Sequence, residues 1–367
     1  MKISFERDNF FQSFQIAASV AAKRDVKPIL QNVKITVDKK HGVMLQATDT
    51  EFGVRLFVAD CDITEKGEAI LPTGKIKAIL TECPGSTLTL EGTETKTSVS
   101  SFQSKWTLDT QSPDEFPNIE EFTEKAYHEI AAKTLKEMIR RTTFATDQDN
   151  AKYALGGVFF EMLESSISVV ATDGRRMAWQ DGSGTSIKDH KIESAILPTK
   201  ILQLLERALP DDDTVVKVAV SESRVIFECG TMVFFSRLVE GRFPKWRNII
   251  PDQTSNTSVN VMCGALYSAV KQAAITTANN EPGVFFTFSE GKLELRGVGR
   301  EVGESNTEVP ITYSGDKQEF KLDPKYMTDV LRVLDAETNL EIYPPRNGDP
   351  FVLKTEDSYQ YIVMPMS

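Results

Sequence analysis

The chain has 367 residues, of which 40% are hydrophobic and 26% are charged, a composition typical of a soluble globular protein. Its formal net charge of -11 excludes a protein that coats nucleic acid with its whole surface, but it does not exclude a local basic surface. No apolar run approaches the ~18 residues of a membrane span, and the charged start Met1–Asp8 is unlike a signal peptide. The four cysteines lie far apart, so we expect buried free thiols in a cytoplasmic protein.

A repeat divides the chain into three. The segment Ala171–Met177 (ATDGRRM) has an earlier counterpart in Ala47–Glu51 (ATDTE), and each is followed by an apolar-Pro-Thr segment. The prolines of these segments, with that of a fainter third copy, stand at positions 72, 198 and 324, a period of 126 residues. We therefore expect three similar modules, 1–122, 123–252 and 253–367.

The predicted elements of the first module are two helices and five strands. Phe10 and Phe14 belong to a helical apolar pattern that predicts a helix over 6–24. Pro72 is expected in the first turn of a second helix over 72–83, because the missing N–H of proline costs nothing there. Strand patterns cover Leu30–Val37, Val43–Thr48, Gly53–Val58, Leu88–Leu90 and Thr97–Leu108.

The second and third modules repeat this order. Helices are expected over 132–144, 198–209, 263–274 and 323–334. Strands are expected over Gly157–Met162, Ile167–Thr172, Val215–Val220, Arg224–Glu228, Val284–Phe288, Leu293–Gly297 and Tyr359–Met364. Every module combines two helices with short strands, which predicts an α+β fold.

Positive charge is concentrated on the predicted helices. Their six windows carry a summed formal charge of +7, so the remainder of the chain carries -18. Lys133, Lys136 and Arg140 are spaced i, i+3, i+7 and share one helix face. The other helices carry Lys75, Lys77, Lys200, Arg207, Lys271, Lys325 and Arg332. Two interpretations remain open: the helices turn basic faces toward one anionic object, or these are ordinary solvated faces.

No catalytic or metal-binding pattern stands out. The three histidines, His41, His128 and His190, have no metal-ligand spacing and no cysteine nearby. Gly297–Gly303 has the pattern GxGxxxG, one residue longer than a dinucleotide loop, and we interpret its residues as loop glycines. Asp211–Asp213 is interpreted as a solvated turn at a helix end. We expect a protein that is not an enzyme and has no catalytic residues, metal or cofactor.

Several segments together resemble a known family. The matching segments, in chain order, are Lys27–Leu30, Ala47–Asp49, Ala171–Ala178, Ile196–Pro198, Glu240–Pro244 and Tyr361–Met366. Over essentially the whole chain they are similar to the bacterial DNA polymerase III β subunits, the sliding clamps. Each motif alone is weak, whereas the combination is specific.

The resemblance implies three DNA-clamp domains, each with two helices packed on antiparallel sheets, and a head-to-tail homodimer that forms a six-domain ring around double-stranded DNA. Rough geometry agrees, because touching spheres of ~35 Å leave a hole of about 5 Å for three domains and about 35 Å for six. Contacts with phosphates can then be weak and independent of sequence. The implied protein is a non-catalytic processivity factor for DNA replication. Its implied partners are the replicative polymerase α subunit, the clamp loader and clamp-binding repair proteins, without a membrane.

The resemblance also assigns site residues. DNA-contacting positions of the family match Arg24, Gln148, Lys152, Tyr153 and Lys200, to which spacing and charge add the other helix cations given above. The family's pocket for partner peptides matches Leu155, Thr172, Gly174, Arg175, Arg176, Met177, Pro244, Ile249, Ile362, Val363, Met364, Pro365 and Met366. Methionines re-pack around varied ligands, which suits a shared site. The first-module copy lacks the Gly-Arg-Arg-Met continuation and is predicted not to bind such peptides.

Some positions depart from the family pattern. Arg175 stands where many relatives have histidine, and the chain stops at Met366–Ser367 without the family's common basic-leucine ending. These departures bear on partner preference. Two other classes of function stay open: a three-repeat hydrolase, which needs a recurring carboxylate pair, and an acidic scaffold, which predicts no aligned basic faces.

Overall fold

The structure, a computed structural model, describes residues 1–23, 27–147, 149, 154–251, 258–278, 282–300, 302–345 and 348–366. The chain forms two compact units, each assembled from separate segments. The first unit comprises Met1–Lys133, Thr185–His190 and Leu204–Leu238, and the second comprises Thr134–Gly184, Lys191–Gln203 and Val239–Ser367. The predicted second module therefore contributes to both units, and the predicted module boundaries stay a prediction.

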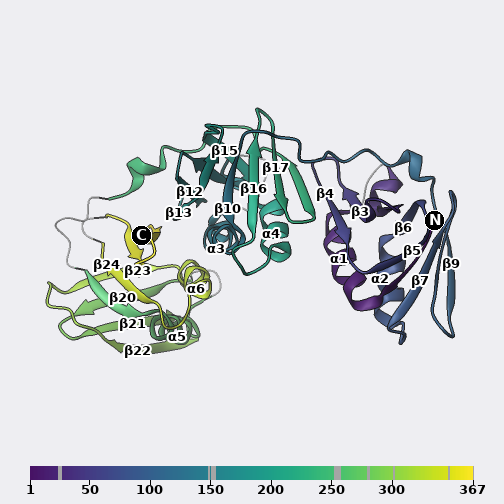
Figure 1. Cartoon of the computed structure of the whole chain (residues 1–367). Coiled ribbons are helices and arrows are strands. Elements are labelled where there is room, and N and C mark those ends of the chain that lie inside the picture. Colours follow the sequence, from purple (N-terminus) through teal and green to yellow (C-terminus); the bar gives the residue numbers. More distant parts are fainter. Residues whose placement is uncertain are drawn as a thin grey trace. The chain divides into compact units, whose positions relative to one another are not determined.

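The first unit contains two antiparallel sheets (Figure 1). A five-stranded sheet has the order β5 (Cys61–Glu65), β1 (Lys2–Glu6), β7 (Thr87–Gly92), β8 (Lys96–Ser100) and β9 (Lys105–Asp109). A nine-stranded sheet has the order β14 (Thr185–Ile187), β10 (Tyr127–Ala131), β16 (Val215–Val220), β17 (Arg224–Cys229), β18 (Met232–Arg237), β4 (Phe52–Val58), β3 (Gly42–Thr48), β2 (Asn32–Asp38) and β6 (Gly67–Pro72). The β18–β4 pair makes this sheet continuous between the first and second modules.

The second unit also contains two antiparallel sheets. An eight-stranded sheet has the order β15 (Ile192–Pro198), β11 (Gly157–Met162), β12 (Ser166–Thr172), β13 (Arg176–Ser183), β26 (Tyr359–Val363), β25 (Phe351–Lys354), β24 (Asn339–Tyr343) and β19 (Val259–Met262). A four-stranded sheet has the order β22 (Gly303–Pro310), β21 (Lys292–Gly299), β20 (Val284–Ser289) and β23 (Gln318–Leu322). Here the β13–β26 pair joins the second and third modules.

Six α-helices lie in the described part of the chain, at the predicted places. They are α1 (Arg7–Val20), α2 (Thr73–Glu82), α3 (Ala132–Thr142), α4 (Thr199–Ala208), α5 (Cys263–Ala274) and α6 (Pro324–Arg332). Within the first unit α1 packs on α2 and on β3 and β4, and within the second α5 packs on α6 and on β21 and β22 (Figure 1). Buried apolar side chains such as Phe10 and Phe14 form the inner face of α1, as the periodicity predicts. The α+β fold with two helices per module on antiparallel sheets is confirmed.

The prolines of the repeat do not all open helices. Pro72 and Pro198 are the last residues of β6 and β15, which are outermost strands of their sheets, and the helices begin at the following threonines. Edge strands tolerate proline because its missing N–H is not needed by a neighbour. Only Pro324 occupies the first position of a helix, where Asp323 caps the backbone N–H of Lys325.

Two other sequence interpretations need correction. The run Thr97–Leu108 is a hairpin rather than one strand: β8 and β9 are joined by a turn in which the N–H of Ser101 bonds the carbonyl of Ser104. Gly297 and Gly299 are not loop residues but lie in β21. A Cβ at Gly297 would stand 1.9 Å from the carbonyl oxygen of Ala273, so helix α5 approaches this strand too closely for a side chain.

Many strands were not predicted from the sequence. They are β1, β5, β6, β10, β13, β14, β15, β18, β19, β22, β23, β24 and β25. β22 is an edge strand with the polar sequence GESNTEVP, and β14 has only 3 residues. These two strands show no period-two apolar pattern, whereas β1 and β24 do alternate buried and more exposed residues and were overlooked.

Three of the four thiols are buried, as expected, and all four are free. Cys61 on β5 is only half-buried. Burial, with the nearby carboxylates of Asp60 and Asp62, raises the pKa of the Cys61 thiol to about 11. The thiol therefore stays protonated, and hence a poor nucleophile, at neutral pH.

Candidate functional site

The turn Thr172–Arg176 connects β12 to β13 and is held by its own side chains. The carboxylate of Asp173 accepts the backbone N–H groups of Arg175 and Arg176 at 2.9 and 3.0 Å. The hydroxyl of Thr172 donates to the carbonyl of Arg176 at 2.6 Å, and Gly174 adopts a left-handed φ of 86°. These local bonds fix the turn without outside help.

The first-module copy folds in the same way. The carboxylate of Asp49 accepts the N–H groups of Glu51 and Phe52 at 3.1 and 3.0 Å, and the Thr48 hydroxyl donates to the carbonyl of Phe52. Thr50 takes the left-handed place of the glycine, with φ of 75°. The Thr-Asp pair is therefore a turn motif, which explains why it recurs. What differs between the copies is the sequence that follows.

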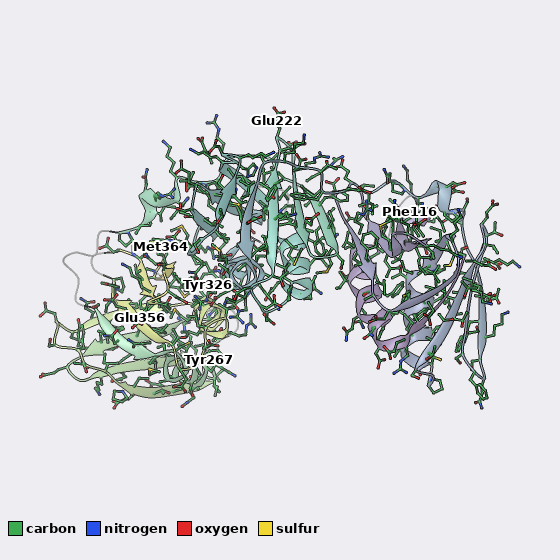
Figure 2. The ribbon with its side chains drawn as sticks, viewed as in Figure 1. Phe116, Glu222, Tyr267, Tyr326, Glu356 and Met364 are labelled. Carbon is green, nitrogen blue, oxygen red and sulfur yellow. The ribbon has the colours of Figure 1, made fainter. Side chains whose placement is uncertain are left out.

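Strand pairing brings the two ends of the predicted peptide pocket together. β13 lies beside β26, with Arg176 opposite Val363 and Met177 opposite Ile362. The N–H of Met364 donates to the carbonyl of Arg175 at 2.9 Å. Met364, labelled in Figure 2, directly follows β26 in the chain. Segments that are far apart in sequence thus form one continuous surface.

The floor of this surface is an apolar cluster. Met177 and Ile362 are each 2% exposed and pack with Phe159, Trp179 and Trp246. The rings of Trp179 and Trp246 lie 5.2 Å apart. The other members of the cluster, buried or packed against it, are Val170, Ile196, Val352, Ala154, Val239, Phe243, Ile250 and Tyr343.

The rim is exposed and apolar. Ile249, at the end of the 3₁₀ helix Trp246–Ile249, and Met364 are each 44% exposed, although large apolar side chains are usually buried. Of the remaining predicted pocket residues, Gly174, Arg175 and Pro244 are exposed and Leu155, Pro365 and Met366 are half-buried. Thr172, Arg176 and Val363 are buried. Met366 also forms a β-bridge with Lys321 of β23.

Arg176 is buried inside an ionic and aromatic cage. Its Nε donates to Asp173 at 3.0 Å and its Nη1 donates to Asp329 of α6 at 2.8 Å. Its Nη2 donates to the carbonyl of Phe144 at 2.8 Å. The guanidinium carbon lies 5.5 Å from the ring centre of Phe144 and 4.4 Å from that of Tyr326. Burial lowers the pKa of Arg176, but the surrounding oxygens, including both carboxylates, raise it further, so the side chain stays charged.

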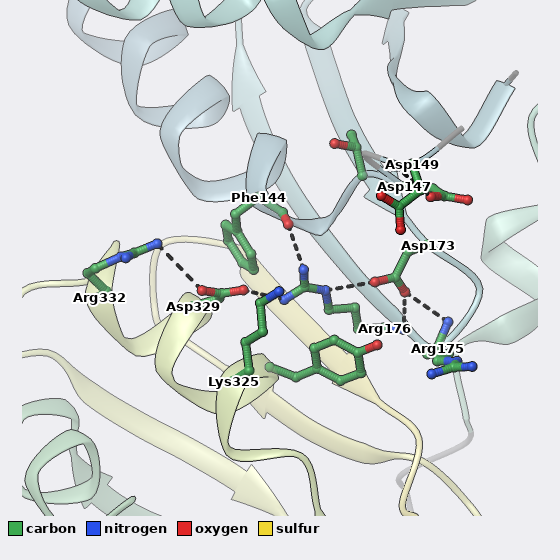
Figure 3. A pocket seen from close by; sticks show the side chains of 11 residues that line it. Phe144, Asp147, Asp149, Asp173, Arg175, Arg176, Lys325, Asp329 and Arg332 are labelled. Carbon is green, nitrogen blue, oxygen red and sulfur yellow. Dashed lines mark hydrogen bonds and ion pairs between the residues drawn. The ribbon is translucent and has the colours of Figure 1, made fainter. Parts of the chain in front are cut away.

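A polar cavity of about 720 Å³ lies beside this cage (Figure 3). It is lined by Phe144, Thr146, Asp147, Asp149, Asp173, Arg175, Arg176, Lys325, Tyr326, Asp329 and Arg332. Arg175 of the turn and Lys325 of helix α6 both face it (Figure 3). One turn therefore borders two different surfaces: the apolar floor on one side and this polar cavity on the other.

The predicted DNA-contacting cations lie on the helices. Nine of them are exposed, namely Lys75, Lys77, Lys133, Arg140, Lys200, Arg207, Lys271, Lys325 and Arg332, whereas Lys136 is half-buried. Lys133 pairs with Asp213 at 2.8 Å, and the hydrogen bond that its ammonium group donates to this carboxylate raises the pKa of the lysine. The buried faces of the helices, for example Ile201 and Leu205 of α4, pack inward as predicted. Arg24, Gln148, Lys152 and Tyr153 lie outside the described residues.

Sequence reasoning missed several residues that shape the site. Trp246 and Trp179 form part of the apolar floor, and Tyr326 and Asp329 hold Arg176. A tryptophan two residues after the Phe243-Pro244 motif was the one available signal. Asp329 gave none, because it lies 153 positions from its partner Arg176.

The described residues contain neither a metal-binding cluster nor a helix that could cross a membrane. No group of three or more His, Cys, Asp or Glu side chains there is placed to hold a metal ion. Among the described helices, none has the length and apolar content that would let it cross a membrane.

Comparison with known proteins identifies the class of this fold. Models of the DNA polymerase III beta subunit match residues 1–120 with its N-terminal domain, 129–245 with its central domain and 247–367 with its C-terminal domain. The class is thus that of the clamp subunits of bacterial replication. The chain belongs to the DNA polymerase III beta subunit family.

The relatives are distant but match along their full length. The Beta sliding clamp of Pseudomonas aeruginosa is 29% identical, with 100% of each chain covered, and that of Escherichia coli K12 is 28% identical with the same coverage. A crystal structure of a sliding clamp from Pseudomonas aeruginosa bound to griselimycin has a TM-score of 0.91 at 26% identity, covering 100% of this chain and 99% of the other. The clamp of Bacillus subtilis, at 23% identity and a TM-score of 0.90, covering 100% and 99%, shows the fold alone.

Proposed function

We propose that two copies of this chain close head to tail into a ring that encircles double-stranded DNA and tethers partner proteins to it. The protein is a sliding clamp, a processivity factor without catalysis of its own. The observation that carries the proposal is a strand pairing that recurs at both module junctions and leaves two matching edges open. Our three-module division, 1–122, 123–252 and 253–367, is part of the proposal.

The junctions follow one rule. At each, the strand after the Thr-Asp turn of one module pairs with the last strand of the next module. β4 pairs in this way with β18, placing Phe52 opposite Ser236. β13 pairs in the same way with β26, placing Arg176 opposite Val363. Phe52 and Arg176 occupy the same place in the repeat, as do Ser236 and Val363.

The third module has a strand after its turn, β22, and the first module has a last strand, β9. In the described part of the chain both are outermost strands without a second neighbour. Applying the same rule, β22 of one copy pairs with β9 of the other, which places Val302 opposite Leu108 and Glu304 opposite Trp106. Joining the five-stranded and four-stranded sheets would give a nine-stranded sheet, like the one already present in the first unit. A head-to-tail contact of this kind closes into a ring of two.

Exposed apolar side chains support this pairing. At the β13–β26 junction, Asp357 on the turn before β26 bonds Arg141 near the end of α3. The equivalent places at the open edges are Phe102 on the β8–β9 turn and Gln272 on α5. Ile275 is the residue directly after α5. Phe102 is 98% exposed and Ile275 is 74% exposed. Apolar groups this exposed indicate a contact that forms in the assembly.

We propose that the DNA runs through the ring along the exposed faces of the helices. Their exposed cations contrast with the net charge of -11 of the whole chain, and nothing in their spacing selects a base sequence. The proposed contacts are Arg24, Lys75, Lys77, Lys133, Lys136, Arg140, Gln148, Lys152, Tyr153, Lys200, Arg207, Lys271, Lys325 and Arg332. Encirclement makes tight binding unnecessary, so these contacts can be weak and allow sliding.

Partner peptides are proposed to bind on the surface formed by β13, β26 and the Trp246–Ile249 helix. Its apolar floor and its exposed rim of Ile249 and Met364 fit a short peptide with apolar anchors. The proposed partners are the replicative polymerase α subunit, the clamp loader and repair proteins. We place these interactions in the cytoplasm, because the chromosome is replicated there.

One loading experiment tests the function. The protein is loaded by a clamp loader onto nicked circular duplex DNA, and the circle is then cut once. A topological clamp stays on the uncut circle and is lost from the linear form by sliding off its ends. Retention on linear DNA, or a protein that stays monomeric at micromolar concentration, would overturn the proposal.

A further inference from the structure

We propose that Arg176 supports partner binding by positioning the pocket, without touching the partner peptide. This inference rests on the proposed function of the β13–β26 surface. The resemblance places Arg176 among the residues that line the pocket. Its contacts in the structure favour a different role, that of an ionic link between the turn and helix α6.

The side chain of Arg176 lies on the opposite face of the sheet from the pocket floor. Neighbouring residues of a strand point to opposite faces, and Met177 packs into the apolar cluster with Trp179 and Ile362. Arg176 instead contacts Asp329 and Tyr326 of α6. Figure 3 shows its guanidinium surrounded by Asp173, Asp329 and the ring of Phe144.

Each nitrogen of the Arg176 guanidinium donates a hydrogen bond within the protein. Nε, Nη1 and Nη2 each donate to a different oxygen, from the turn, from α6 and from the segment after α3. The guanidinium also lies against the rings of Phe144 and Tyr326. The residue is 7% exposed. A peptide on the other face of the sheet would have to break this cage to reach it.

The cage is particular to this junction. The equivalent position of the first module is Phe52, which is 4% exposed and apolar, and that of the third module is Val302. A buried ionic network contributes little net stability compared with apolar packing, but it fixes one arrangement of its elements because each charge needs its partner. The β13–β26 junction, which carries the proposed pocket, is thus the one at which this position makes ionic contacts that require a fixed arrangement of their partners.

This link determines where the rim of the pocket stands. The Asp173–Arg175 turn is rigid within itself, and the carbonyl of Arg175 holds the N–H of Met364. The chain of bonds from Asp173 through Arg176 to Asp329 links this unit to α6, beside the bond that the Tyr361 hydroxyl of β26 donates to the carbonyl of Tyr326. Without it, the rim would sample several positions, and peptide binding would require selecting one of them.

The test is a set of double-mutant cycles on the full chain. The variants are Arg176→Gln, Arg176→Lys and Asp329→Asn, with Met364→Ala as a variant that removes a proposed contact. The probe is a short fluorescently labelled peptide with apolar anchor residues, taken from a replicative polymerase α subunit, together with single-alanine versions of it. Dissociation constants are measured by fluorescence anisotropy.

We expect Arg176→Gln and Asp329→Asn each to weaken binding of every peptide version by one common factor, about tenfold. The variant that combines both substitutions should bind no more weakly than the weaker-binding of the two single variants. Arg176→Lys should recover part of the loss. Met364→Ala should instead show coupling to one particular peptide residue. Coupling of Arg176→Gln to a single peptide residue, or unchanged affinity in both Arg176→Gln and Asp329→Asn, would overturn the inference.

Failure of the inference can be told apart from failure of the proposed function. If the wild-type chain neither binds the peptide nor loads on DNA, the function is wrong. If the wild-type chain binds and the cage variants bind equally well, only the role of Arg176 is wrong. Tryptophan fluorescence, to which Trp179 and Trp246 of the floor contribute beside Trp106, reports whether each variant keeps the wild-type fold. Asp329→Asn carries the test if Arg176→Gln does not fold.

Discussion

The strongest prediction concerns Ile275, the exposed apolar residue that follows helix α5. In Ile275→Ala, three carbon atoms that the proposed ring contact buries are removed. At about 0.8 kcal/mol for each buried methylene-sized group, scaled by the 74% exposure of the residue, the loss is about 1.8 kcal/mol at each contact. A ring of two copies contains this contact twice, so the dimer loses about 3.6 kcal/mol, which is a dissociation constant weaker by about 400-fold.

Analytical ultracentrifugation over a range of concentrations measures this constant directly. Leu163→Ala is the matched control, since Leu163 is also exposed, at 38%, but lies on the turn between β11 and β12 rather than at an open edge. It should leave the dimer unchanged. A shift in Ile275→Ala no larger than that of the control would refute the assignment of β22 and β9 as the ring contact.

Further predictions concern stability, measured by urea denaturation. Gly297→Ala should lower the free energy of unfolding by about 1–3 kcal/mol, because a Cβ meets the carbonyl of Ala273. Gly74→Ala, in a helix with open space around the new Cβ, should raise it by about 1 kcal/mol; equal effects of the two would contradict the packing argument. Burial raises the pKa of Asp357, but hydrogen bonds from a neighbouring hydroxyl and from Arg141 lower it further, to a value below the usual range. This contribution to stability is present above the unfolded pKa of about 3.9 and is lost as the pH falls through the folded pKa, so Arg141→Met should flatten the acid slope of stability.

The elements that the sequence revealed were those with a buried face of their own. The six helices could be predicted because residues such as Phe10 and Ile201 repeat along one side, and strands such as β2 and β20 because every second residue is apolar and buried. The edge strand β22 was not predicted, and the edge strand β9 was predicted as part of one strand with β8. An edge strand depends on its neighbour, and the pattern within the strand does not show that neighbour. For the same reason, the sequence did not show that Pro72 and Pro198 end the edge strands β6 and β15.

In the candidate site, too, local features could be predicted from the sequence and long-range contacts could not. The turn at Asp173 could be found because its bonds are local and its motif repeats. The β13–β26 pairing could be inferred only through resemblance, since Arg176 and Val363 are far apart in sequence. The cage around Arg176 could not be predicted at all: Asp329 and Tyr326 are ordinary residues of an amphipathic helix until the fold brings them to the guanidinium.

The continuous sheet across β18 and β4 has a consequence for dissecting this chain. A fragment cut at the boundary near residue 122 would keep β4 but lose its hydrogen-bonding neighbour, exposing an edge that carries the apolar residues Phe52, Val54 and Leu56. Such edges recruit other strands and lead to aggregation. The same cut made in the intact chain would sever the backbone while the sheet still held both pieces together. The limits of a cooperative unit are thus set by which strands pair, and a boundary in sequence need not be a boundary in folding.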